Sequence, residues 1–230
     1  MFKKFKGILI DIDNTLYDYD FCHSIGYDNV KKYCERNMQV NNKTFDDTYI
    51  KSRKIINKNL SKTASSHNRI LYFQNFCERL NINPLKNALI MSNIYWKSFY
   101  DKMTLFPYVE ELLGQVSNKK LCLITDFTAN IQYQKVEKLN LQKYIGYMVT
   151  SEEVGIEKPN KIIFNYAIKK MGLKPKEVCM IGDNYKKDII GATRLGIHSF
   201  WFNRYKKDVK NSQLVTQFEN YKLLLGDSYD

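Results

Sequence analysis

The stretch Gly7-Ile8-Leu9-Ile10-Asp11-Ile12-Asp13-Asn14-Thr15-Leu16 is a short apolar run that ends abruptly in two carboxylates, an amide and a hydroxyl. Such a run of β-forming side chains is typical of a strand that is buried on both faces of a parallel sheet. Its polar residues then lie at the carboxyl end of the strand, where open α/β sheets bind their ligands. Because Asp, Asn and Thr are also ordinary turn residues, the stretch alone leaves a plain turn as an equal alternative.

Two later apolar runs end in the same way. Residues 121–124 lead into Thr125-Asp126, and residues 178–181 lead into Gly182-Asp183. The carboxyl ends of parallel strands meet at one edge of a sheet, so we expect the polar residues after all three runs to converge there. Lys158, which precedes a proline between the second and third runs, could reach the same edge.

Strand and helix patterns alternate after residue 105. This alternation predicts a Rossmann-like α/β fold, with a parallel sheet, right-handed crossovers and helices on both faces. The predicted elements are, in order, a helix opened by Pro107, a strand at 121–124, a helix at 130–139, a strand at 147–150, a helix that begins at Lys158-Pro159 and ends at Gly172, a strand at 178–181, a helix through 188–195 closed by Gly196, a last strand at 198–202, and an amphipathic helix through Leu214, Phe218, Tyr221 and Leu225.

The block between the first two strands has helical character and few strand signals. Its four predicted helices cover 21–38, a segment from a capping box of Thr44 and Asp47 towards Leu60, a segment from a Ser65 or Ser66 cap to Leu80, and a segment from Asn83-Pro84 to Tyr100. We therefore expect two domains. Residues 1–16 and 105–230 would form the α/β core, and residues 17–104 an inserted four-helix cap over the carboxyl edge of the sheet.

Composition bounds the class of protein. The chain has 230 residues, 44% of them apolar, which is enough to bury a core. No apolar stretch approaches the roughly 18 to 20 residues of a membrane span, and Asp11 interrupts a start that otherwise imitates a secretory signal. Five scattered cysteines fit neither a disulfide framework nor a zinc site, so the sequence predicts a cytoplasmic protein with reduced thiols.

The formal net charge of +12 is spread over the whole chain. Spread charge is typical of a solvated surface, whereas nucleic-acid-binding proteins gather it on one face. Neither nucleic acid nor a membrane is therefore an expected partner. A diffuse positive field favours a small phosphorylated substrate.

The predicted edge of the sheet is strongly negative. Asp11, Asp13 and Asp183, together with Asp188 or Asp126, could not all stay ionised without a cation. Mg²⁺ prefers carboxylate, carbonyl, water and phosphate oxygens as ligands. The residues therefore predict a Mg²⁺ site at this edge.

The ordered set of motifs resembles that of the haloacid dehalogenase-like (HAD) superfamily over essentially the whole chain. The resemblance rests on residues 11–16, on Thr125 after an apolar strand, on Lys158-Pro159, and on residues 182–188. The helical block resembles the small cap of the subfamily that includes phosphoglycolate phosphatase, β-phosphoglucomutase, N-acylneuraminate-9-phosphatase and several 5′-nucleotidases.

The resemblance implies a catalytic role for four residues. Asp11 would attack phosphorus and become an aspartyl phosphate. Asp13 would protonate the leaving alkoxide and then activate water, and crowding beside Asp11 is expected to raise its pKa for this purpose. Thr125 would hydrogen-bond a phosphoryl oxygen, and Lys158 would neutralise both the nucleophile and the transferring group.

The resemblance also implies the metal ligands. Mg²⁺ would be held by Asp11, by the backbone carbonyl of Asp13 and by Asp183. Asp188 would hydrogen-bond the metal's water or Lys158.

Substrate contacts are expected from both predicted domains. Thr125 and Lys158 would bind the phosphate, and the backbone N–H of Asp126 would join them, although asparagine or glycine is more usual at that position of the subfamily. In the cap, His67 and Arg69 lie near a predicted helix start and could meet the leaving group. A capped helix with solvated charge explains these two residues equally well.

The predicted function is a Mg²⁺-dependent phosphatase of a small phosphorylated metabolite, either a nucleoside monophosphate or a sugar phosphate, acting as a monomer or homodimer. Asp13 argues against a dehalogenase, because a leaving halide needs no acid. Two alternatives stay open. One is a phosphomutase of the same superfamily, and the other is a regulatory or nucleic-acid-binding protein that keeps the scaffold without catalysis.

Overall fold

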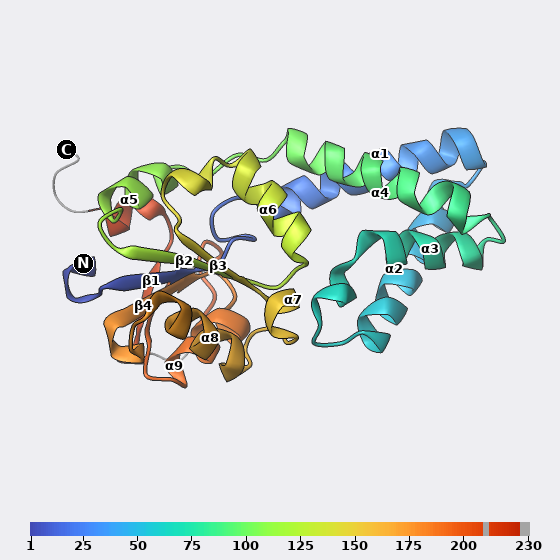
Figure 1. Ribbon diagram of the computed structural model, residues 1–230. Helices are drawn as coiled ribbons and strands as arrows, with labels where there is room; N and C mark the ends of the chain where they lie inside the picture. The colour runs from blue at the N-terminus through green and yellow to red at the C-terminus, as the bar shows by residue number, and fades with distance from the viewer. Residues whose placement is uncertain (209–211, 226–230) are drawn as a thin grey trace. The chain divides into compact units, whose positions relative to one another are not determined.

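The computed structural model describes residues 1–208 and 212–225. The chain forms two compact units, one of Met1–Asp18 with Thr104–Asp230 and one of Tyr19–Met103. The first unit is built around a β-sheet, and the second is helical (Figure 1).

The first unit contains, within the described residues, a six-stranded sheet in the order β3-β2-β1-β4-β5-β6. Its strands are β1 (Gly7–Ile10), β2 (Lys120–Thr125), β3 (Tyr147–Thr150), β4 (Val178–Gly182), β5 (His198–Phe202) and β6 (Val215–Phe218). All neighbouring strands pair in parallel, which confirms the predicted parallel α/β sheet. Ile8 of β1 pairs with Leu121 on one side and with Cys179 on the other, so the opening stretch of the chain is a central strand.

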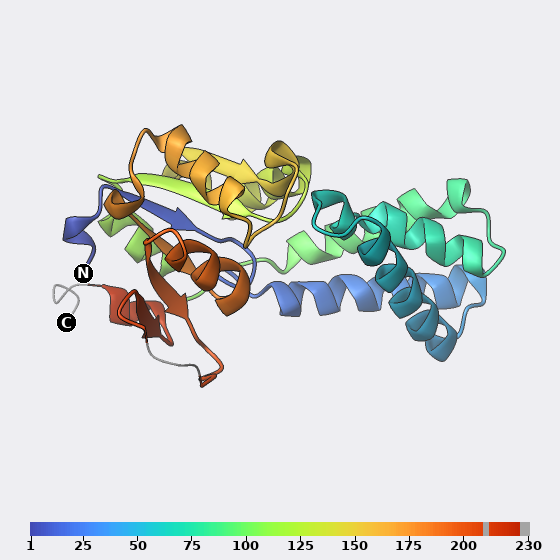
Figure 2. The ribbon, with the colours of Figure 1, turned by 90° about the horizontal axis from the view of Figure 1, so that it is seen from below.

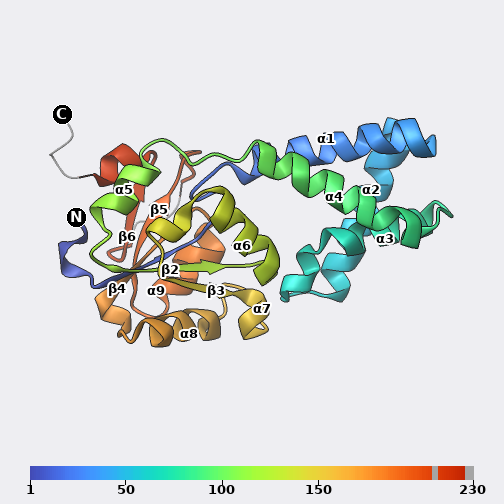
Figure 3. The same cartoon turned by 45° about the horizontal axis from the view of Figure 1, so that its top comes forward.

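Helices cover both faces of this sheet, with α5 and α6 on one face and α8 and α9 on the other (Figures 1 and 3). They are α5 (Val109–Gln115), α6 (Ala129–Lys138), α7 (Ser151–Val154), α8 (Lys161–Met171) and α9 (Ile190–Thr193), with 3-10 turns at Phe2–Lys4, Leu141–Lys143, Pro175–Glu177 and Tyr221–Leu224 and a π-helical turn at Tyr185–Ile189. Leu9 of β1 packs with Ile163 and Phe164 of α8 in a fully buried core. All four residues of β1 are buried, so the strand that leads to Asp11 is covered on both faces.

The predicted C-terminal helix is wrong, and residues 198–202 are not the last strand. Val215–Phe218 form β6, which pairs with β5 through Phe202 and Phe218, and a 3-10 turn follows at Tyr221–Leu224. The spacing of the apolar residues fits a helix, but the open edge of β5 offers backbone hydrogen bonds to a strand. Phe218 and Tyr221 then bury their rings against Phe202.

Other helix starts also differ from prediction. Helix α5 begins at Val109, after Tyr108, rather than at Pro107. Helix α8 begins at Lys161 rather than at Lys158-Pro159, because the side chain of Asn160 accepts the Ile162 N–H at 3.0 Å and caps the helix. The helix predicted through 188–195 is divided between the π-helical turn and α9, and Gly196 follows with a φ of +73°. Asp188 therefore lies in a π-helical turn, where its side chain folds back on the end of β4.

The second unit, whose residues are all described, contains α1 (Tyr19–Met38), α2 (Asn42–Asn59), α3 (Arg69–Arg79) and α4 (Pro84–Asp101), with a 3-10 turn at Ala64–His67. Helices α1 and α4 pack side by side (Figure 2). Gly26 permits this approach, because a Cβ there would lie 2.9 Å from the carbonyl oxygen of Tyr95. The four predicted helices are present in the predicted order.

Two of the predicted caps in this unit are wrong. Asn41, not Thr44, caps α2, because its side chain accepts the Thr44 N–H at 2.9 Å. Asn68, rather than either serine, caps α3, because the serines lie in the preceding 3-10 turn. Asn83 caps α4 as predicted. In all three cases an asparagine side chain satisfies the first free N–H groups of the helix.

The structure also bears on the predicted thiols and on the membrane spans that the sequence argues against. The five cysteines are all buried and carry free thiols. Over residues 1–208 and 212–225, no helix combines the length and the apolar character that crossing a bilayer requires.

Candidate active site

The carboxyl ends of three central strands bring predicted site residues together. Strand β1 lies between β2 and β4 (Figure 1). Asp11 after β1, Thr125 at the end of β2 and Asp183 after β4 therefore share one edge of the sheet. The Asp11 N–H donates to the Ile181 carbonyl at 3.0 Å, which continues the strand pairing up to the first carboxylate. The position of Asp11 is therefore fixed by the sheet itself.

The ammonium group of Lys158 lies between two buried carboxylates. Its Nζ is 2.5 Å from Asp11 Oδ1 and 2.7 Å from Asp188 Oδ1, and it also donates to the Ile124 carbonyl at 3.0 Å. Lys158 is 4% exposed. Burial lowers its pKa, but the carboxylates outweigh burial and raise the pKa well above its usual range. Lys158 therefore stays charged and faces Asp11.

Thr15 joins the first and last motifs. Its hydroxyl donates to Asp11 Oδ2 at 3.0 Å and accepts the backbone N–H of Asp183 at 3.0 Å. The Tyr221 hydroxyl donates to the Thr15 carbonyl at 2.6 Å, so a residue more than two hundred positions along the chain anchors this loop. Sequence reasoning gave neither Thr15 nor Tyr221 a place in the site.

Asp11, Asp183 and Asp188 form a group of carboxylates that could hold a metal ion, because one oxygen of each lies within 4.8 Å of the others. Burial raises the pKa of all three carboxyl groups. Like charge from Asp188 adds to this at the other two, so that the pKa of Asp11 is raised well above its usual range and that of Asp183 to about 7. A bound cation would relieve this crowding. Carboxylate oxygens also suit a hard divalent cation, so the residues present fit such a metal.

Gly182 allows the Asp188 side chain to reach this group. A Cβ at position 182 would lie 2.6 Å from both Asp188 Cβ and Asp188 Oδ2. The same Oδ2 accepts the Asn184 N–H at 3.0 Å. A glycine is therefore required at the end of β4, because a larger residue there would clash with the side chain of Asp188.

Asp13 has a different environment from Asp11, although only one residue separates them. Lys135 Nζ lies 2.6 Å from Asp13 Oδ1, the Tyr17 hydroxyl donates to the same oxygen, and Gln132 Nε2 donates to Oδ2 at 3.2 Å. Burial raises the pKa of Asp13, but the charge and hydrogen bonds of Lys135 outweigh it and the net pKa is lowered. The expected rise in the pKa of Asp13 from crowding is therefore wrong for this structure.

Lys135 and Gln132 were missed by sequence reasoning. Both side chains are fully buried, and they lie one turn apart on the inner face of α6. A buried lysine is rare unless it is paired. The available signal was a polar i, i+3 pair on a helix face that apolar residues should have occupied.

The neighbours of Thr125 and Asp126 separate the roles of these two residues. The Thr125 hydroxyl accepts Gln132 Nε2 at 2.6 Å, so its own hydrogen remains available to donate. Asp126 accepts the Lys158 backbone N–H at 3.0 Å through Oδ1 and pairs with Lys187 Nζ at 2.8 Å through Oδ2. Asp126 thus holds the loop that carries Lys158, and a direct substrate contact by Asp126 stays a prediction.

His67 and Arg69 lie in the helical unit. Arg69 is 4% exposed, and its guanidinium donates to the His67 carbonyl at 2.8 Å and to the Tyr95 hydroxyl at 3.2 Å. The guanidinium also lies 4.9 Å from the centre of the Tyr95 ring and 5.5 Å from that of Trp96. These contacts give Arg69 a packing role within the unit, and substrate binding by His67 and Arg69 stays a prediction.

Comparisons with known proteins give relatives that cover most of the chain. The chain is 30% identical to a ribulose-1,5-bisphosphate 5-phosphatase of Halopiger xanaduensis over 86% of its own length and 84% of that protein. It is 26% identical to the pyrimidine 5'-nucleotidase YjjG of Escherichia coli over 89% of each chain.

A solved structure shares the fold. The HAD hydrolase YfnB of Bacillus subtilis superposes with a TM-score of 0.74 at 17% identity, over 96% of this chain and 97% of that one. Residues 5–196 match the family described as haloacid dehalogenase-like hydrolase, which spans all four motifs. The chain therefore belongs to the haloacid dehalogenase-like hydrolase family.

Proposed function

We propose that this chain is a Mg²⁺-dependent phosphatase that hydrolyses a small phosphorylated metabolite through an aspartyl phosphate on Asp11. The observation that carries the proposal is the pairing of Asp11 with the buried Lys158 ammonium at 2.5 Å, beside carboxylates that fit a divalent cation. The reaction class, phosphoric monoester hydrolysis, is the one named for both relatives described above.

The first step is attack of the Asp11 carboxylate on phosphorus. Burial and the neighbouring acids raise the pKa of Asp11, so the nucleophile needs positive charge to stay ionised. Lys158 supplies part of that charge and also faces the incoming phosphoryl oxygens. When bound, Mg²⁺ would supply the rest, with Asp11, Asp183 and the backbone carbonyl of Asp13 as its ligands and Asp188 beside them.

Thr125 acts on the phosphoryl group, and Asp13 acts on the leaving group and on the attacking water. The Thr125 hydroxyl, whose oxygen already accepts Gln132, donates its hydrogen to a phosphoryl oxygen. Asp13 protonates the leaving alkoxide and later takes a proton from the attacking water. The charge and hydrogen bonds of Lys135 outweigh burial and lower the pKa of Asp13, which favours the base step. A bound phosphate brings like charge close to Asp13 and raises its pKa for the acid step.

The substrate is a sugar phosphate or a nucleoside monophosphate. These are the substrate classes that the names of the two relatives print, a ribulose bisphosphate and a pyrimidine nucleotide. The helical unit of residues 19–103 serves as the cap that selects the leaving group, with His67 and Arg69 as the predicted contacts. The chain is further proposed to act in the cytoplasm as a monomer or homodimer.

The test measures phosphate release from a panel of sugar phosphates and nucleoside monophosphates, with and without Mg²⁺. Asp11→Asn should abolish turnover, because an amide cannot form the phosphoenzyme. Asp28→Asn, which changes an exposed aspartate of α1, is the control and should match the unmodified chain. Unchanged hydrolysis by the Asp11 variant would refute the nucleophile.

The same measurement addresses the alternatives left open by the sequence. A phosphomutase would move phosphate between two positions of a sugar and release little of it. A scaffold without catalysis would release none, and nucleic-acid binding would then be tested by retention on DNA at moderate salt.

A further inference from the structure

Three side chains hold the carboxyl group of Asp13 in one orientation. Oδ1 accepts both the Lys135 ammonium, at 2.6 Å, and the Tyr17 hydroxyl, whereas Oδ2 accepts the longer 3.2 Å bond from Gln132 Nε2. The two oxygens are therefore unequal. The strong donors occupy Oδ1, and Oδ2 keeps the greater capacity to accept or carry a proton.

Lys135 is unusual among the lysines of the chain in being completely buried. Its ammonium lies 2.6 Å from Asp13 and 4.2 Å from the centre of the Phe127 ring. Burying an ammonium group is costly and is recovered only where the geometry is good. A helix that needed only an apolar inner face would carry an aliphatic side chain here, so the position points to a purpose at Asp13.

Gln132 joins the Asp13 carboxyl to the phosphate-binding hydroxyl. Its Nε2 atom donates one hydrogen bond to Thr125 Oγ1, at 2.6 Å, and a second to Asp13 Oδ2, at 3.2 Å. One amide group thus fixes the Thr125 oxygen as an acceptor and limits rotation of the Asp13 carboxyl. Helix α6, which carries Gln132, therefore sets the spacing between the Asp13 carboxyl group and the Thr125 hydroxyl.

We propose that Lys135, Gln132 and Tyr17 are positioning residues that fix Asp13 so that its Oδ2 meets the leaving-group oxygen and then the attacking water. The inference rests on the proposed phosphatase function. None of the three residues contacts the reacting phosphorus in this scheme. Each acts through Asp13, and their loss should affect the steps that need proton transfer most.

The experiment compares two aryl phosphates that differ in how much help their leaving group needs. Phenyl phosphate has a basic leaving group that requires a proton, whereas 4-nitrophenyl phosphate releases an anion that is stable alone. For Lys135→Met we expect kcat/KM to fall about 10²-fold on phenyl phosphate, as for a catalytic group displaced by about 1 Å. On 4-nitrophenyl phosphate it should fall much less, and Lys135→Arg should restore part of the loss.

Matched controls lie on the same helix. Lys138 and Gln134 are exposed on α6, so Lys138→Met and Gln134→Leu remove the same chemistry without touching Asp13. Gln132→Leu and Tyr17→Phe are milder changes at the Asp13 carboxyl, and both should shift the ratio of the two substrates in the same direction as Lys135→Met. They carry the test if Lys135→Met does not fold.

Equal falls on both substrates, or no fall, for Lys135→Met, Gln132→Leu and Tyr17→Phe would overturn the positioning proposal, because a merely structural role does not depend on the leaving group. The function itself fails separately. If the unmodified chain released phosphate from neither ester with Mg²⁺ present, both proposals would be refuted. If hydrolysis depends on Asp11 but the substrate ratio stays fixed, only the positioning role is lost.

Discussion

Replacing Lys158 by methionine should destabilise the α/β unit in a pH-dependent way. The Lys158 ammonium is 2.5 Å from Asp11 and 2.7 Å from Asp188, and its side chain is 3% exposed. Removing it leaves two buried carboxylates without their cation, which costs about 3 to 5 kcal/mol at neutral pH. For a protein of this length that corresponds to a lowering of Tm by roughly 6 to 20 °C.

The pH dependence follows from the sign of the pKa shifts. Folding raises the pKa of Asp11 well above its ordinary value of 3.8, and it raises that of Asp183 to about 7. A carboxyl group whose pKa is raised by folding does not destabilise the protein at pH values below its unfolded pKa. As pH rises from the unfolded pKa through the folded pKa, the protein loses stability. Without Lys158 these pKa values rise further, so the gap in stability between variant and parent should widen from pH 4 to pH 7.

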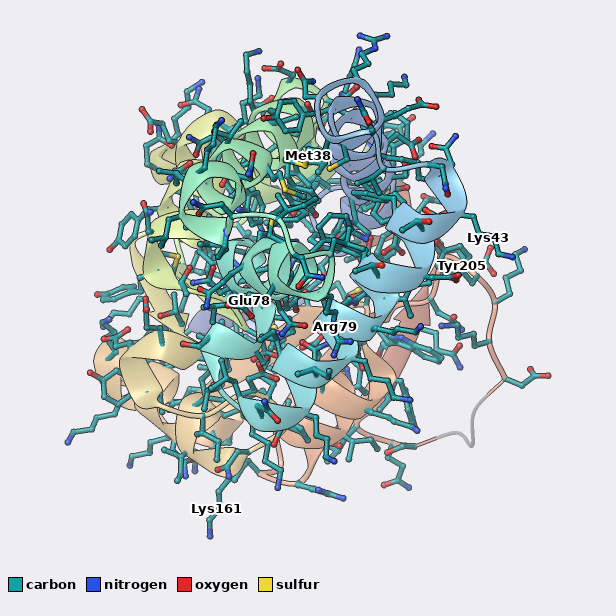
Figure 4. The ribbon with its side chains drawn as sticks, turned by 90° about the vertical axis from the view of Figure 1, so that its right-hand side faces the viewer. Met38, Lys43, Glu78, Arg79, Lys161 and Tyr205 are labelled. Atoms are coloured by element: carbon teal, nitrogen blue, oxygen red, sulfur yellow. The ribbon has the colours of Figure 1, made fainter. Side chains whose placement is uncertain are left out.

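Differential scanning calorimetry at several pH values measures this gap. Lys161→Met is the control, because Lys161 begins the next helix and projects from the surface (Figure 4). It should change Tm little at any pH. A Lys158→Met loss that is the same at pH 4 and pH 7, or no larger than that of Lys161→Met, would contradict the inference that the ammonium compensates buried carboxylates.

Three further outcomes are expected. Mg²⁺ at 100 times its Kd should stabilise the chain by about 2.7 kcal/mol, and Asp183→Asn should weaken this shift; calorimetry with no metal-dependent change in either protein would exclude the site. Gly182→Ala drives a methyl group into the neighbouring carboxylate and should cost about 1 to 3 kcal/mol in urea unfolding and much of the activity, whereas Gly146→Ala, with open space around it, should not. Asn68→Ala should cost about 1 kcal/mol of stability and Ser65→Ala less, since only the asparagine caps α3; the reverse order would restore the predicted cap.

The parts of the fold that the sequence predicts well are those set by local patterns. Each central strand is a short apolar run that stops at a polar residue, and this local signal locates Asp11, Thr125 and Asp183 before any packing is known. Parallel pairing then brings the strand ends together. The Asn83-Pro84 start of α4 is equally local, because the cap and the first turn lie next to each other in the chain.

The C-terminal error has a non-local cause. Leu214, Phe218, Tyr221 and Leu225 have the spacing of a helix face, and nothing within the segment argues against that interpretation. The segment becomes a strand because the edge of β5 offers it backbone hydrogen bonds, and Ser199 of β5 donates its N–H to the Leu214 carbonyl at 2.8 Å. The pairing partner lies outside the segment, so no local window of sequence contains the information that makes it a strand.

Asp11 and Asp13 show the same limit at the level of chemistry. In sequence they are two equivalent carboxylates, and crowding predicts a raised pKa for whichever acts as the acid. The structure raises the pKa of Asp11 by burial among other acids, and it lowers that of Asp13 through Lys135, from a helix more than one hundred residues later.

Environments that push two neighbouring pKa values apart are a physical basis for dividing roles between acid–base and other catalytic groups. Here the separation comes from burial and the neighbouring acids, which raise the pKa of Asp11 despite Lys158, and from Lys135, which lowers the pKa of Asp13. Lys158 forms ion pairs with Asp11 and Asp188, and Lys135 forms one with Asp13. Both cations are buried, so each holds its carboxylate where water screens the interaction little. The proposed division of labour between Asp11 and Asp13 therefore depends on the environment of each carboxylate. Asp11 shares Lys158 with Asp188, whereas Asp13 faces Lys135 and accepts hydrogen bonds from Tyr17 and Gln132.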